Sequence, residues 1–160
     1  MKGTILYPTR GGKGSYANQY RVIHLAKERG EGLIFLYISN VQFLGLTASP
    51  IVVDVETELD EMGDFLLAMA QERAEKAGVK AKTLVRRGLF REKLKEVIQE
   101  YPITSVVLGR SSASTSLITQ EYTDELGEEI SRETGVQFLV IEDGEIVETY
   151  HPPVSRSNPT

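Results

Sequence analysis

The stretch Val106-Val107-Leu108-Gly109-Arg110-Ser111-Ser112 decides the fold of this chain. An apolar run that ends in a glycine and a serine-rich segment is typical of a buried parallel β-strand. Such a strand delivers small residues and backbone amides to the carboxyl edge of its sheet, where α/β proteins bind their ligands. We therefore expect a ligand site beside Gly109.

On both sides of this stretch, short apolar runs alternate with helical patterns. The runs predict strands at 4–8, 33–38, 82–86, the residues before Gly109, and 137–141, with helices at 15–29, 56–77, 90–100 and 119–133. Strands joined by helical crossovers predict an α/β fold, a five-stranded parallel doubly wound sheet in the order 3-2-1-4-5 with helices on both faces. After a turn signal at 142–145, the alternation of residues 146–150 predicts a C-terminal antiparallel edge strand.

Helical periodicity also predicts which side chains face the core. The first helix carries Tyr16, Tyr20, Ile23 and Lys27 on one face, and His24 falls one residue off that face and is expected at the surface. For the second helix, the residues at core spacing are Leu59, Met62, Leu66, Met69, Ala70, Ala74 and Ala77.

Composition limits the classes of function. A chain of 160 residues suits one core, so we expect a single domain over 1–150 and a flexible tail over 151–160. No cysteine is present and histidines number 2, which argues against disulfides, thiolate chemistry and a metal site. The net charge of −5 disfavours nucleic-acid binding. No apolar run approaches the roughly 18 residues of a membrane span, and Met1-Lys2-Gly3-Thr4 does not resemble a signal peptide, so we expect a cytoplasmic protein.

The element spacing resembles that of a known family. Arg86-Arg87-Gly88, a helix, the strand ending at Gly109, and a further helix leading to 136–141 resemble the C-terminal half of a universal stress protein. The runs at 5–9 and 36–41 resemble that family's first two strands, so the resemblance covers roughly residues 3–142. It implies a homodimer through an edge strand, here near Gln137–Ile141 or Ile146–Tyr150.

The nucleotide signature of that family is degenerate here. In members that bind ATP, the motif begins with a glycine, which is followed by two residues and a second glycine. Nine residues then lead to a third glycine, which is followed by serine or threonine. Gly109 is retained, but Ser112 replaces the second glycine, and Tyr122-Thr123 or Asp124-Glu125 replaces the last pair. We expect carboxylates to crowd the first turns of the last helix, where they would repel a triphosphate. These are Glu121, Asp124, Glu125, Glu128 and Glu129.

A second departure follows the first strand, where the family commonly has an aspartate and this chain has Thr9-Arg10-Gly11-Gly12-Lys13-Gly14-Ser15. Strands one and four are neighbours in the expected order, so Arg10 and Arg110 should border one crevice and need an anion or acidic side chains between them. In the alternative, the arginines pair with Glu121 and Asp124 and close a vestigial pocket. The candidate site comprises Thr9, Arg10, Gly11, Gly12, Lys13, Gly14, Val41, Gly109, Arg110, Ser111 and Ser112.

The function expected from these features is a binding or regulatory module of the stress response that lacks catalytic machinery and is not a standard ATP binder. One alternative is an ATP- or AMP-binding protein, with Val41 near the base and Gly109 and Ser112 near the ribose and phosphates, in which slow hydrolysis stays open. Another is a nucleotide-independent interaction module that works through residues 42–55. A nucleophile elbow at Ser111 with His151 is disfavoured, because hydrolases of that kind have more strands.

Overall fold

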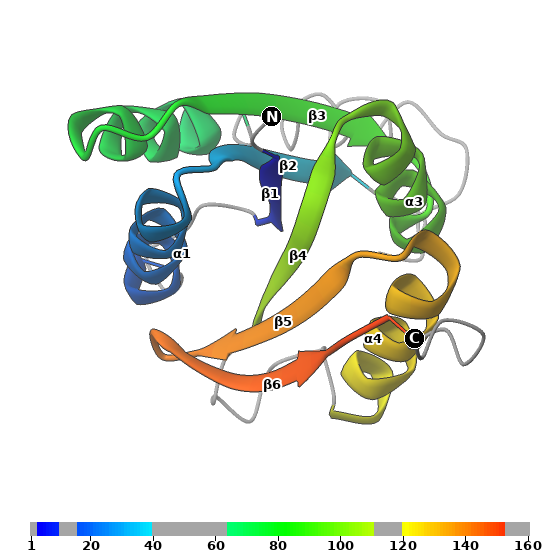
Figure 1. The fold of residues 1–160 in the computed structure, drawn as a ribbon. Coiled ribbons are helices and arrows are strands. Elements are labelled where there is room, and N and C mark those ends of the chain that lie inside the picture. The colour runs from blue at the N-terminus through cyan, green and yellow to red at the C-terminus, as the bar shows by residue number, and fades with distance from the viewer. Residues whose placement is uncertain (1–2, 10–15, 40–63, 111–119, 153–160) are drawn as a thin grey trace.

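The computed structural model describes residues 3–9, 16–39, 64–110 and 120–152. Their centre is a 6-stranded sheet in the order β3-β2-β1-β4-β5-β6 (Figure 1). Neighbouring strands are parallel except for the antiparallel pair β5 and β6. The strands are β1 (Thr4–Pro8), β2 (Gly32–Ser39), β3 (Ala81–Arg87), β4 (Ile103–Arg110), β5 (Gln137–Glu142) and β6 (Glu145–Tyr150). The predicted fold class, strand order and added edge strand are confirmed.

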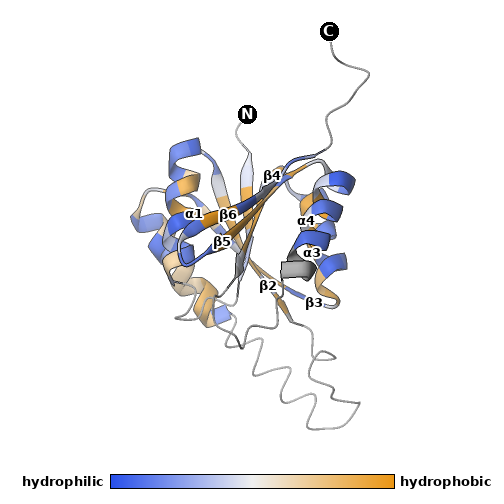
Figure 2. Ribbon diagram, turned by 90° about the horizontal axis from the view of Figure 1, so that it is seen from below, coloured by the Kyte–Doolittle hydropathy of each residue, from blue (hydrophilic) through white to orange (hydrophobic). Residues whose placement is uncertain are grey.

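Helices cover both faces of the sheet. On one face lie α1 (Tyr16–Arg29) and the helical residues 64–76, and on the other lie α3 (Phe90–Glu100) and α4 (Gln120–Thr134). Two hydrophobic clusters result, because successive strand side chains point to opposite faces. Ile5 and Tyr7 join the α1 cluster, whereas Leu6 joins the α3 and α4 cluster. Figure 2 shows the apolar strands between helices whose outer surfaces are hydrophilic.

The inward faces of two helices agree only in part with those predicted: Ile23 on α1, and Ala70 and Ala74 on the helix of residues 64–76, are buried as expected. In α1, the buried side chains include Val22, Leu25 and Ala26, whereas Tyr20 is 57% exposed. In the helix of residues 64–76, Leu67 is buried instead of Leu66. Both differences have the same cause: the hydrophobic period alone does not fix how a helix is turned about its axis, so residues at neighbouring positions face the sheet instead. His24 is exposed, as predicted.

The hairpin between β5 and β6 turns through Asp143 and Gly144, which have φ angles of 51° and 83°. Two consecutive residues with positive φ match the right-handed twist of the strands that they join. The turn packs against α1, since a Cβ atom on Gly144 would lie 3.4 Å from the carbonyl oxygen of Ala17. The hairpin thereby reaches the beginning of α1, next to the carboxyl edge of the sheet.

In the part of the chain that the structure describes, none of the helices has the length and apolar character that crossing a membrane requires.

Candidate ligand site at the carboxyl edge of the sheet

Two of the predicted site residues, Thr9 and Gly109, lie beside neighbouring strands. β1 and β4 pair in parallel with Leu6 opposite Val106, and Thr9 and Gly109 are each three residues farther along. The backbone N–H of Thr9 donates to the carbonyl oxygen of Leu36 at 2.8 Å, which holds the chain at the end of β1. The structure thus brings these two residues to the switch point of the sheet, as the sequence predicts.

Gly109 is closely surrounded by side chains from β1 and α1. A Cβ atom at this position would lie 3.1 Å from Asn18 Nδ2 and 3.2 Å from the hydroxyl oxygen of Tyr7. Val107, two residues earlier on β4, belongs to the cluster under α1, so this side of the strand faces α1. The missing side chain of Gly109 therefore makes room for Tyr7 and Asn18.

Tyr7 is a buried phenol at the end of β1. Its side chain is 1% exposed, and its ring packs edge-on against Phe35 with a centroid distance of 6.1 Å. Burial raises the pKa of Tyr7 to about 12, and a hydrogen bond with the Thr9 side chain opposes this effect. Tyr7 is therefore a neutral, fixed part of the site at physiological pH.

Asn18 joins the site to the hairpin. It is 5% exposed, and its Oδ1 accepts a hydrogen bond of 2.7 Å from the backbone N–H of Gly144. Sequence reasoning missed this residue, although a signal was present: Asn18, Val22 and Leu25 are spaced i, i+4, i+7, which places an amide on the buried face of the helix. A buried amide needs hydrogen-bond partners, and here the turn of the hairpin supplies one.

The structure does not test the other predicted site residues. Arg10, Gly11, Gly12, Lys13, Gly14, Val41, Ser111 and Ser112 lie outside the described residues, as does the side chain of Arg110. Arg110 is the last residue of β4, and its backbone pairs with Glu142 in β5. That the two arginines face one crevice therefore stays a prediction.

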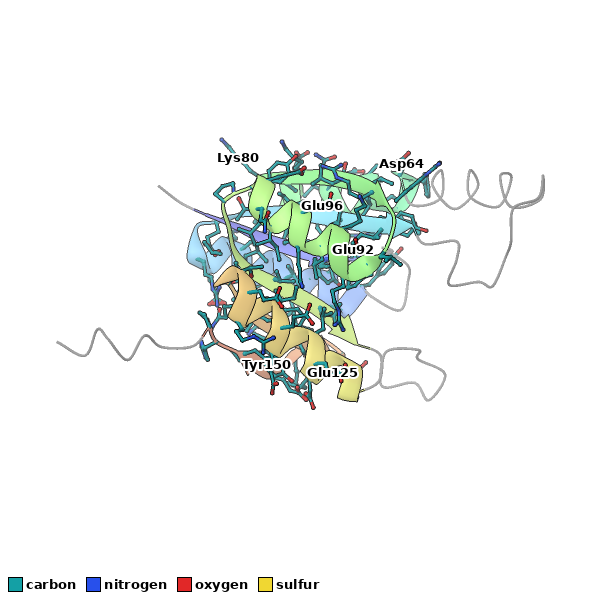
Figure 3. All side chains as sticks on the ribbon, turned by 90° about the vertical axis from the view of Figure 1, so that its right-hand side faces the viewer. Asp64, Lys80, Glu92, Glu96, Glu125 and Tyr150 are labelled. Carbon is teal, nitrogen blue, oxygen red and sulfur yellow. The ribbon has the colours of Figure 1, made fainter. Side chains whose placement is uncertain are left out.

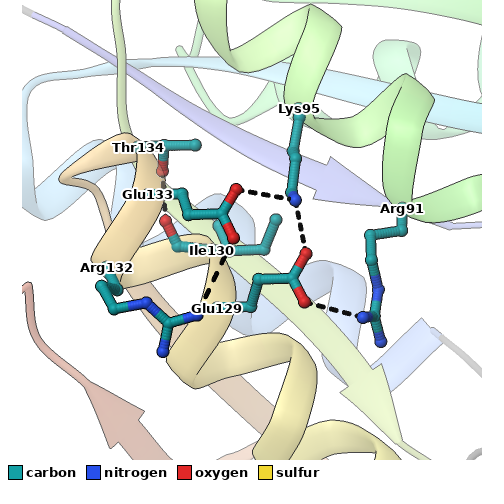
Figure 4. A network of polar contacts seen from close by, with 7 residues as sticks. All are labelled: Arg91, Lys95, Glu129, Ile130, Arg132, Glu133 and Thr134. Atoms are coloured by element: carbon teal, nitrogen blue, oxygen red, sulfur yellow. Dashed lines mark hydrogen bonds and ion pairs between the residues drawn. The ribbon is translucent and has the colours of Figure 1, made fainter.

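Two of the acidic residues expected at the start of the last helix contact side chains of other elements of the fold. Glu129 lies on the third turn of α4 and faces α3, where Arg91 Nη1 donates to its Oε1 at 2.7 Å and Lys95 contacts its Oε2 (Figure 4). The hydrogen bond from Lys95 is the main cause that lowers the pKa of Glu129. Asp124 accepts a hydrogen bond from Tyr150. The expectation that Glu129 crowds the helix terminus is therefore wrong.

Tyr150 attaches β6 to α4. Its hydroxyl contacts carboxylate oxygens of Asp124 and Glu148, and its ring lies so close to Gly127 that a Cβ there would approach within 2.6 Å. Burial raises the pKa of Tyr150, and the two carboxylates add to the effect. Asp124 is thus already bound within the fold, and His151 is exposed at the end of β6.

No three histidine or carboxylate side chains gather into a metal site within the described ranges.

Comparisons with known proteins agree with this architecture. A sequence model of the Universal stress protein family matches residues 1–118. Among curated proteins, none matches the sequence. Among solved structures, a universal stress family protein from Burkholderia pseudomallei is similar with a TM-score of 0.64 and 18% identity, over 87% of this chain and 95% of that one.

Two further solved structures are similar. UspA from Lactobacillus plantarum has a TM-score of 0.63 and 19% identity, over 87% of this chain and 97% of its own. A universal stress protein in complex with cAMP has a TM-score of 0.57 and 17% identity, over 89% of this chain and 98% of its own. At these identities the likeness concerns the fold.

Proposed function

Because the chain belongs to the universal stress protein family, we propose that it is a binding or regulatory module of the stress response whose carboxyl-edge site is not a standard ATP site. Its role would depend on what binds near Thr9 and Gly109.

The environment of Gly109 carries this proposal. In a phosphate-binding loop, a glycine lets the ligand approach the backbone closely. Here the side chains of Tyr7 and Asn18 already lie 3.2 Å and 3.1 Å from the point where a Cβ would stand. The packing of these side chains from β1 and α1 thus accounts for the glycine without a nucleotide.

The sequence after Gly109 supports the same proposal. Ser112 stands where nucleotide-binding relatives have a second glycine, and Tyr122-Thr123 or Asp124-Glu125 stands in place of the final glycine and hydroxyl residue. A Cβ at each of these positions would restrict the close approach of phosphate oxygens to backbone amides.

Titration calorimetry with ATP, AMP and inorganic phosphate tests the proposal. We expect ATP to bind more weakly than about 100 µM, which corresponds to about −5.5 kcal/mol. Tighter binding of ATP would contradict it. Binding of phosphate alone that is lost in the variant Arg10→Gln/Arg110→Gln would indicate an anion site between the regions of Arg10 and Arg110.

A second candidate function is binding of an adenine nucleotide such as AMP. The observation that favours it is the similar solved structure in complex with cAMP. In this case the nucleotide would lie between β1 and β4, with Val41 near the base. Saturable binding of AMP in the same titrations, with displacement by ATP, would support this candidate over the first.

We further propose that a homodimer forms through β6. β5 pairs with β4 on one side and β6 on the other, so the exposed edge at this end of the sheet belongs to β6. Val147 on that strand is 43% exposed. Unpaired strand edges are ready to pair with a second chain. The variant Val147→Lys should then shift the mass measured by light scattering from dimer to monomer, whereas Lys76→Gln should not.

A further inference from the structure

β3 lies at the opposite edge of the sheet from β6. It pairs with β2 on one side, and within the described ranges no strand pairs with its other side. Figure 3 shows Lys80, which precedes β3, and Tyr150, which ends β6, at opposite ends of the molecule. The pairing of β3 with β2 runs from Ala81 to Arg87 without a shift in register, whereas the pairing of β6 with β5 contains one. β3 is therefore the more regular of the two edges, and a regular edge accepts a further strand more readily.

The register of β3 shows which backbone groups face outward. Leu33 lies opposite Ala81, and its N–H donates to the carbonyl oxygen of Lys80. In a parallel pair this pattern directs the polar backbone groups of Lys80, and of every second residue after it, toward β2. The N–H and C=O groups of Ala81, Thr83 and Val85 therefore point away from β2.

Side-chain donors confirm this direction at two carbonyls. Gln71, on the helix that precedes β3, donates through Nε2 to the carbonyl oxygen of Ala81 at 2.8 Å, and Arg86 Nη1 donates to that of Val85 at 3.4 Å. Thr83 lies between them, and none of the described side chains bonds to its backbone N–H or C=O. The centre of the β3 edge therefore keeps both a donor and an acceptor for another strand.

The side chains of β3 carry positive charge and no negative charge. Lys82, Arg86 and Arg87 lie on this strand, in a chain whose net charge is −5. Lys82 is exposed, its Nζ lies 5.3 Å from the centroid of the Tyr101 ring, and none of the described carboxylates pairs with it. Arg86 pairs with Glu100, and its side chain is still 32% exposed. A second copy of β3 would bring like charges together, whereas a strand with carboxylates would bring opposite charges together.

The alternation of β3 sets the order of side chains that a partner needs. Leu84 packs against the cluster under α3 and α4, so Lys82 and Arg86, two residues to either side, share this face of the sheet. Directly opposite residues of paired strands have their side chains on the same face. A partner would therefore place carboxylates opposite Lys82 and Arg86, and an apolar side chain opposite Leu84, which is only partly buried.

We propose that the β3 edge binds an extended acidic peptide segment as an additional strand. The backbone of the segment would bond to the outward groups of Thr83 and Val85, and its side chains would follow the order acidic, any residue, apolar, any residue, acidic. This order is the same in both directions, so it suits parallel and antiparallel pairing. Backbone hydrogen bonds supply affinity in this mode of recognition, and alternate side chains supply specificity. The proposal is independent of the carboxyl-edge site and of a dimer through β6.

The test is a titration of the ¹⁵N-labelled full chain with the synthetic peptide acetyl-Thr-Glu-Thr-Val-Thr-Glu-Thr-amide. We expect saturable shifts centred on Thr83 and Val85, and slower hydrogen exchange of these two amides when the peptide is bound. The amide of Leu84 already faces β2, so its exchange should change less. The same peptide N-methylated at its three central residues keeps its charge but lacks their N–H groups, and it should bind about tenfold more weakly.

Variants of the protein separate strand pairing from general attraction of charge. Thr83→Pro removes an N–H that points away from β2, a position at which an edge strand tolerates proline, and it should abolish the shifts. Lys82→Glu should weaken binding about fivefold. Lys76→Glu, the same charge reversal on an exposed residue of the preceding helix, should not. Circular dichroism checks that each variant folds. Equal affinity for the N-methylated peptide, or equal binding by the Lys82→Glu and Lys76→Glu variants, would overturn the proposal.

Discussion

The hydroxyl oxygen of Tyr7 lies 3.2 Å from the position that a Cβ atom on Gly109 would occupy. Tyr7 lies near the end of β1 and faces α1, and Gly109 lies near the end of the neighbouring strand, so the phenol of one fills the space that the other leaves open. Asn18 approaches the same point from α1 at 3.1 Å. The three residues form a packed contact between α1 and the switch point of the sheet, and its requirements explain why a glycine stands there.

This contact predicts the effect of adding one methyl group. Gly109→Ala should lower the free energy of unfolding by about 1–3 kcal/mol, because the neighbouring side chains must move to admit it. Urea denaturation measures the change. Gly32→Ala is the matched control, since its Cβ would meet its nearest neighbours at 3.6 Å, an ordinary contact. An equal loss in both variants would contradict the account of Gly109.

The hydrogen bond between Asn18 and the hairpin predicts a local effect. Asn18→Ala removes the acceptor of the Gly144 N–H and should destabilise the protein by about 1–2 kcal/mol. Hydrogen exchange at the Gly144 amide should become faster, while exchange in β2 follows only the change in global stability. Gln99→Ala, an exposed change on α3, is the control. Unchanged exchange at Gly144 would argue against the link.

The ion pairs of Glu129 predict that the stability of the fold depends on pH in the acid range. Its pKa is lowered in the folded chain, so its contribution to stability is present above its usual value of 4.5 and is lost as pH falls through the lowered value. Glu129→Gln should cost about 0.5–1 kcal/mol at pH 7 and progressively less below pH 4.5. Urea denaturation at several pH values, with the exposed neighbour Glu128→Gln as control, measures this difference. A cost that is constant with pH would refute the assignment.

The burial of Tyr7 predicts that the stability of the fold depends on pH in the alkaline range. Its pKa is about 12 in the folded chain against a usual value of 10.0, so the unfolded chain ionises first. The contribution of Tyr7 to stability is then fully present below pH 10.0 and is lost as pH rises through about 12. Tyr7→Phe should show a flatter fall of the free energy of unfolding over this range than the parent protein, measured by urea denaturation. Equal slopes would mean that Tyr7 is not buried as a neutral phenol.

Much of the fold follows from patterns in the sequence, because strands and helices differ in hydrophobic period. The boundaries of β1 and α3 agree with the predicted ranges 4–8 and 90–100. The inward face of α1 is predicted less well, since Tyr20 is long and apolar yet exposed, while Ala26 is small and fully buried. Periodicity identifies a face, but packing depth depends on which side chains fit close to the sheet.

The site is harder to predict than the fold. Thr9 and Gly109 could be placed together from the strand order, which follows from right-handed crossovers. Asn18 could not, because its partner Gly144 is 126 residues away and the pairing depends on how the hairpin lies on α1. The orientation of Glu129 toward α3 likewise depends on the packing of two helices that the sequence does not reveal.

The most direct test of the central claim is a titration of ATP into the ¹⁵N-labelled protein, followed at the amides of Thr9 and Gly109. Because Tyr7 and Asn18 occupy the space beside Gly109, we predict no saturation of these shifts below about 100 µM ATP. Saturation at lower concentrations, with the largest shifts at Thr9 and Gly109, would show that the carboxyl edge is an ATP site and would contradict the account.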